Sequence, residues 1–198
     1  MNLLGHVGLS IAIAYSTDTL VFKSARGHDW RLSSSRFKHF AIWVDTNIDY
    51  RVVIISSVAA DLIDKPLGLW LVPNFVSYNT RSFGHSFLFC LTLLLICVIF
   101  RKPWRLNMII FAVIYTFHLI FDQMWIHREI SLWPLYGLGF PVIDPTTFSE
   151  YSGNVLSNLY NFYKYPWELT GMLIITLFII RIILKGNIIS FFRQGKVN

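Results

Sequence analysis

Apolar residues gather in five long stretches of the chain, at roughly 3–22, 52–72, 85–100, 107–126 and 167–184. Each stretch is close to the length of about 20 residues that an α-helix needs to cross a bilayer. The third has no charged residue from Phe87 through Phe100, and the fifth contains only Arg181 between Leu169 and Leu184. This pattern predicts an all-α fold, a polytopic membrane helix bundle of about five transmembrane helices.

Two longer polar segments separate the apolar stretches. The loop 23–51 is basic, and the connection 127–166 is rich in Pro, Tyr, Asn and Ser. Trp133-Pro134 and Tyr165-Pro166-Trp167 place aromatic rings near the ends of this connection, and such rings favour the membrane interface. We expect the connection to lie over the outer mouth of the bundle, and residues 1–198 to form a single integral membrane domain.

Composition supports the membrane class. The chain of 198 residues is 55% hydrophobic and 14% charged, whereas an average soluble domain is about 25% charged. The low charge content excludes an ordinary soluble domain and a disordered chain, and it argues that the net charge of +6 is not a nucleic-acid-binding face. The principal partner is then the lipid bilayer.

The basic residues predict how the bundle is oriented. Thirteen of the 17 Lys and Arg residues lie in segments 23–51, 101–106 and 181–198. These segments alternate with the poorly charged ones, and cytoplasmic loops near helix ends carry excess Lys and Arg. We therefore expect a cell (inner or plasma) membrane protein whose N-terminus faces away from the cytoplasm.

Ionisable residues inside apolar segments are costly and usually functional. His118 and Asp122 are four residues apart in the fourth stretch, so one helix face presents both. An imidazole and a carboxylate on one face suit a divalent ion such as zinc or manganese, or an acid–base pair. An interhelical polar clamp is the alternative.

The second stretch carries a pair of acids, Asp61 and Asp64, three residues apart before Lys65-Pro66. Adjacent carboxylates in a medium of low dielectric constant repel each other unless a cation lies between them or one is protonated. A metal resolves this conflict, although Asp64 paired with Lys65 is the simpler alternative. Pro66 predicts that the helix ends or kinks just beyond the acids.

Two further elements complete the candidate site. Arg81 and His85 precede the charge-free stretch, and they share a face if a helix capped by Thr80 or Ser82 begins there. Arg81 can stabilise an oxyanion, and His85 can bind a metal or transfer a proton. The alternatives are an arginine that snorkels to the interface and a histidine at the membrane interface. His6 lies between two glycines near the start of the first stretch. The predicted topology places these groups in the middle or non-cytoplasmic part of the membrane.

In this order, the elements resemble the YdjM family of predicted membrane-bound metal-dependent hydrolases. The resemblance rests on His6, on Asp61 to Asp64, on the run Arg81-Ser82-Phe83-Gly84-His85-Ser86, on His118 with Asp122, and on Trp133-Pro134. It covers residues 5 to 135. The chain departs from the family pattern by an extra residue between its two acids and by Thr80-Arg81-Ser82 where the family has His-Arg-Gly, which removes one candidate ligand.

These observations favour a membrane-embedded hydrolase that acts on a phosphoester or lipid-linked substrate through a metal-activated water. The expected metal ligands are His6, Asp61, Asp64, His85, His118 and Asp122, and the metal is zinc, with manganese as the alternative. Arg81, His85 and Asp61 are the expected catalytic residues, with Arg81 on the substrate anion. A cation or proton-coupled carrier and a non-catalytic structural membrane protein are the competing hypotheses.

Overall fold

The computed structural model describes residues 3–22, 48–99, 104–142 and 164–197. Within these residues all regular structure is helical, which confirms the predicted all-α fold. The principal helices are α1 (Leu3–Thr17), α4 (Tyr50–Pro66), α5 (Phe87–Ile99), α6 (Trp104–Phe121), α7 (Arg128–Ser131), α9 (Pro166–Leu184) and α10 (Ile188–Gln194). The predictions for most of the basic loop 23–51 and for the middle of the connection 127–166 lie outside the described residues.

The five longest helices lie on the five apolar stretches. The predicted change at Pro66 is observed, because α4 ends there and continues as the π-helical turn η3 (Leu67–Leu71). Helices α6 and α9, with 18 and 19 residues, are long and apolar enough to cross a membrane. Helix α5 is apolar but has 13 residues. A crossing by all five helices therefore stays a prediction.

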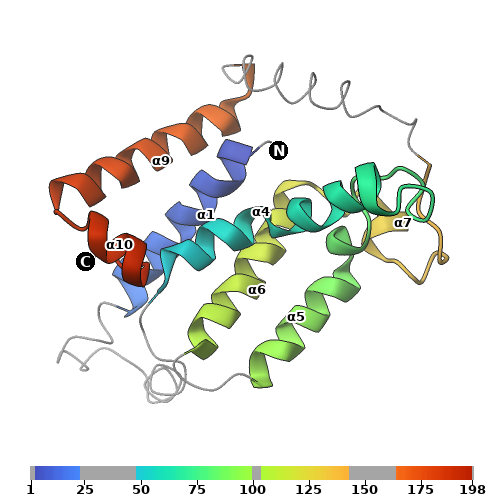
Figure 1. The fold of residues 1–198 in the computed structure, drawn as a ribbon, viewed down its shortest axis with the longest axis horizontal. Helices are drawn as coiled ribbons and strands as arrows, with labels where there is room; N and C mark the ends of the chain where they lie inside the picture. The colour runs from blue at the N-terminus through green and yellow to red at the C-terminus, as the bar shows by residue number, and fades with distance from the viewer. Residues whose placement is uncertain (1–2, 23–47, 100–103, 143–163, 198) are drawn as a thin grey trace.

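Helix α1 lies between α9 and α4, and α5 lies on the outer side of α6 (Figure 1). One apolar cluster joins α1, α4, α6 and α9 through buried side chains that include Ile11, Val53, Ile114 and Phe178. A second cluster around Tyr115 and Leu119 packs α6 against α4 and the segment that follows α6. These two clusters fix the helices that carry the ionisable residues.

The two ends of the bundle differ in chemistry. The start of α4 lies beside the C-terminal segment, since the backbone N–H of Tyr50 donates to Gly195 O at 2.9 Å and Arg51 Nη1 donates to Phe192 O at 3.0 Å. The backbone N–H of Asp49 donates to Asn107 Oδ1 at 3.0 Å, which places the start of α6 at this end as well. The ionisable residues of the candidate site all lie at the opposite end.

Candidate metal centre

Asp64 is the anchor of the site. It lies in the last turn of α4 with a fully buried side chain. Its carboxylate accepts hydrogen bonds from the backbone N–H groups of Ser82, Gly84 and His85 at 2.6, 2.9 and 3.1 Å and from Ser82 Oγ at 2.9 Å. His85 Nδ1 donates to the same carboxylate at 2.7 Å. The loop that carries His85 is thus wrapped around one buried acid.

The space around this loop is tight at position 84. A Cβ atom there would lie 3.1 Å from Ala60 O, from Asp64 Oδ1 and from Tyr115 Oη. The Tyr115 hydroxyl donates to Gly84 O and so ties the loop to α6. The short helix η4 (Phe83–His85) follows, and α5 begins only at Phe87. The condition for Arg81 and His85 to share a face, an α-helix starting at Thr80 or Ser82, is therefore not met, because the N–H groups of Ser82, Gly84 and His85 bond to Asp64.

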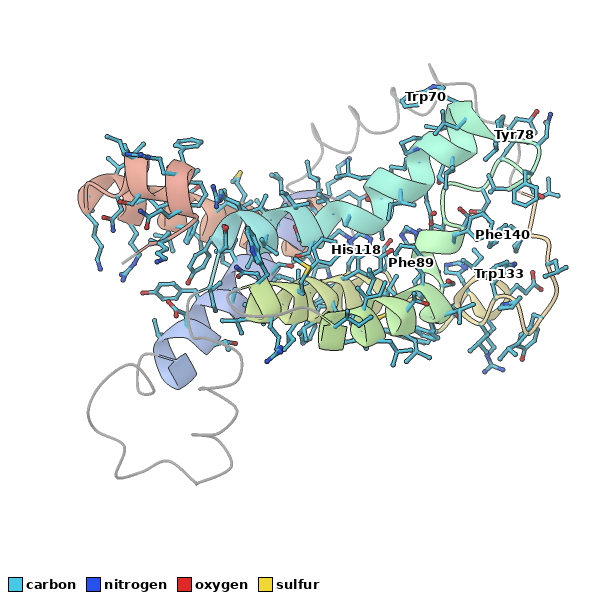
Figure 2. The ribbon with its side chains drawn as sticks, turned by 60° about the horizontal axis from the view of Figure 1, so that its bottom comes forward. Trp70, Tyr78, Phe89, His118, Trp133 and Phe140 are labelled. Carbon is cyan, nitrogen blue, oxygen red and sulfur yellow. The ribbon has the colours of Figure 1, made fainter. Side chains whose placement is uncertain are left out.

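Aromatic side chains hold the outer side of the loop. The Phe83 ring meets Trp133 and Phe140 edge to face, with centroids 5.0 and 4.9 Å apart. Figure 2 shows Trp133 and Phe140 together beyond the end of α5. The described start of the connection 127–166 therefore packs against the loop that positions His85.

His118 faces His85 across the site. It lies between α4 and α6 (Figure 2), and its Nδ1 atom donates to Ser57 O at 2.8 Å. The Nδ1 proton of His85 is directed to Asp64, so each neutral imidazole presents an Nε2 lone pair. These two Nε2 atoms are 3.4 Å apart. Two lone pairs at this distance require a proton or a cation between them.

The spacing fits a metal ion. Imidazole nitrogens lie about 2.0–2.1 Å from zinc, so two of them in a tetrahedral site are about 3.3–3.4 Å apart. The carboxylate oxygens Asp61 Oδ1 and Asp122 Oδ2 lie 3.7 and 3.8 Å from His85 Nε2. Buried carboxylates also orient metal-binding imidazoles through their second nitrogen, as Asp64 does for His85. The donor set is therefore suited to a divalent ion.

His6 brings α1 into the site. Its ring stacks on His118 with centroids 4.1 Å apart and an angle of 23° between the planes. Its Nε2 atom lies 3.0 Å from Asp122 Oδ1, while Arg81 Nη2 lies 3.0 Å from Asp122 Oδ2. The Arg81 side chain is 37% exposed, whereas that of Asp122 is 3% exposed. Arg81 is thus anchored to the site with part of its guanidinium open.

Asp61 differs from its neighbour Asp64. Its Oδ2 atom bonds Lys65 Nζ at 2.7 Å, so the predicted alternative of a Lys65 pair applies to Asp61 and not to Asp64. Its side chain is 20% exposed, and its Oδ1 atom faces His85. Asp61 is therefore the carboxylate of the site that water reaches most easily.

The structure brings all seven predicted site residues together at one end of the bundle. Two groups of donor atoms, each within 4.8 Å, can hold an ion, and both include His118: one with His6 and Asp122, the other with Asp61 and His85. Sequence reasoning missed Ser57, whose carbonyl orients His118, and Tyr115, which holds the loop of His85; it named Ser82 as a helix cap and not as a partner of Asp64. Tyr115, three residues before His118, carries the one recognisable signal, a hydroxyl on an apolar helix.

A cavity of about 430 Å³ opens beside the site, lined by residues that include Asn79, His127, Arg128 and Glu129. Asn79 is buried and links this cavity to the site, because its Oδ1 atom accepts the backbone N–H of Arg81 at 2.9 Å. Its Nδ2 atom donates to Pro141 O at 3.1 Å. The cavity therefore shares a wall with the segment that holds Arg81.

The fold and this cluster define a helical membrane protein with a buried centre of histidine and aspartate. The chain belongs to the YdjM family, since the family model described as YdjM inner membrane protein matches residues 1–189. This finding confirms the resemblance expected from the motifs and extends it beyond residue 135. Neither the comparison with curated proteins nor that with solved structures gives a match.

Proposed function

We propose that the protein is a membrane-embedded metal-dependent hydrolase. The observation that carries this proposal is the pair of Nε2 atoms of His85 and His118, 3.4 Å apart with both Nδ1 protons directed elsewhere. If the two histidines only joined helices, one Nε2 atom would carry a proton and donate it to the other. A cation between the two nitrogens satisfies both at once.

We favour ligands from the two donor groups that share His118, with His6 and Asp122 from one group and His85 from the other. Asp64, expected from the sequence as a ligand, is better suited to orient His85, because five donors already occupy its carboxylate. Imidazole nitrogen with carboxylate oxygen suits zinc first, and manganese is the second choice. A divalent ion supplies an acidified water and polarises the bond to be cleaved.

The remaining side chains then have separate roles. Asp61 Oδ1 accepts a proton from the attacking water, since this carboxylate is the most exposed one of the site and Lys65 holds its second oxygen. Arg81 binds the substrate anion with the exposed part of its guanidinium. Arg128 lines the neighbouring cavity, and the protein belongs to a family of inner membrane proteins. We therefore infer a phosphoester or lipid-linked substrate.

Metal content tests the proposal. In detergent-purified protein loaded with zinc and dialysed, His118→Ala and Asp122→Ala should each retain at least about tenfold less metal than wild type, because both remove donor atoms of the centre. His127→Ala is the matched control, since this exposed histidine lies outside both donor groups. Elemental analysis gives the metal per folded chain.

Two results would contradict the hydrolase assignment. One is equal metal in wild type and His118→Ala. The other is a folded wild type that binds neither zinc nor manganese after loading. Either result would favour the carrier or the structural hypothesis, in which the same polar groups relay a proton or join helices.

The proposed site faces the non-cytoplasmic side. Arg51 and Arg193 lie at the end of the bundle opposite the site, and the predicted basic segments 23–51 and 101–106 adjoin that end. Cytoplasmic ends carry excess positive charge. A reporter fused after Asn198 should therefore give a cytoplasmic signal in paired fluorescent-protein and alkaline phosphatase fusions. Phosphatase activity from the fusion would reverse this orientation.

A further inference from the structure

A buried acid at the start of α9 lies far from the candidate site in sequence and close to it in space. Glu168 is 2% exposed although it stands in the first turn of an otherwise apolar helix. Its Oε2 atom accepts the backbone N–H of Gly5 at 3.1 Å. The first N–H groups of a helix have no partner within the helix, and α1 has no acid in its own first turn. Glu168 therefore supplies, from another helix, an acceptor for one of these N–H groups of α1.

Close backbone contact fixes the same crossing. A Cβ atom on Gly171 would lie 2.2 Å from Leu4 O, and one on Gly8 would lie 2.3 Å from Gly171 O. Only glycine allows such an approach of two helices. The contacts to α9 thus fall at Gly5 and Gly8, on both sides of His6.

His6 is the residue that this crossing places. Its Nε2 atom bonds Asp122 at 3.0 Å, and its ring stacks on His118 at 4.1 Å. The contacts reach α6 and the residue that follows it, so they depend on where the first turn of α1 lies. We propose that Glu168 is a positioning residue of the site, which acts through Gly5 to set His6 against Asp122 and His118. Its effect on metal binding rests on the proposed function.

The direct test follows the His6 ring by NMR of histidine-labelled, metal-free protein in micelles, with the resonance assigned from His6→Gln. Glu168→Ala should shift the His6 resonance, whereas Glu168→Gln, which keeps an acceptor oxygen, should leave it close to wild type. Ile182→Ala is the matched control, because it removes a buried side chain at the far end of the same helix. An unchanged His6 resonance in Glu168→Ala, or an equal shift in Ile182→Ala, overturns the proposal.

A second measurement separates this inference from the proposed function. In Co²⁺ titrations monitored by absorption, Glu168→Ala should bind about 10–100-fold more weakly than wild type, and Glu168→Gln should recover most of the affinity. Ile182→Ala should bind like wild type. Equal weakening in Glu168→Ala and Ile182→Ala overturns the positioning role. Absence of Co²⁺ binding in wild type refutes the metal centre, while the His6 resonance still decides the role of Glu168.

Discussion

Replacement of Asp64 by alanine should lower the free energy of unfolding by about 3–5 kcal/mol, because it leaves several buried donors unsatisfied and each such donor costs about 1–3 kcal/mol. The carboxylate is fully buried, and it accepts the N–H groups of residues 82, 84 and 85 together with Ser82 Oγ and His85 Nδ1. Alanine would leave most of these donors buried without an acceptor, the exception being the His85 N–H, which also bonds Ser82 O at 3.2 Å. Asp64→Asn should recover little of this stability, because the amide NH₂ group would face the N–H donors that the carboxylate now accepts.

Denaturant titration followed by tryptophan fluorescence in mild detergent measures this effect. Glu129→Ala serves as the control, since it removes an exposed acid and should change stability by no more than about 0.5 kcal/mol. If Asp64→Ala lost less than about 1 kcal/mol, the size of one ordinary net hydrogen bond, the loop would not depend on this acid.

The positions of the long helices could be predicted from the sequence because a bilayer imposes long apolar runs. The span predicted for α5 stays a prediction. Its stretch is free of charge from Phe87, yet the helix has 13 residues in the part of the chain described, fewer than α6 or α9. The apolar stretch 85–100 includes His85 and Ser86, but these two residues belong to the loop around Asp64 and not to α5.

The residues that the structure brings together could also be predicted, since six of the seven are ionisable residues within apolar stretches. The division of roles could not. Asp61 and Asp64 are one turn apart on α4, and only the loop around Asp64, 18 to 21 residues later, makes one an anchor and leaves the other partly exposed. The Glu168 contact to Gly5 spans 163 residues, and no local pattern contains it.

Arg81→Ala should reduce kcat/KM for phosphodiester hydrolysis by about 10²–10³-fold, the usual effect of removing one donor that stabilises a developing oxyanion. The guanidinium keeps one nitrogen on Asp122 at 3.0 Å and exposes 37% of its side chain. Initial rates on bis(p-nitrophenyl) phosphate measure the effect. Arg193→Ala is the matched control, an exposed arginine at the opposite end of the bundle.

Metal content decides between two ways in which Arg81 acts. If it binds the substrate anion, Arg81→Ala retains metal while activity falls, and Arg81→Lys recovers part of the rate because it restores the charge without the bidentate geometry. If Arg81 serves only to hold Asp122 Oδ2, metal and activity fall together. Parallel loss would refute the anion-binding role and place Arg81 with Asp64, Ser57 and Tyr115 among the groups that orient the centre.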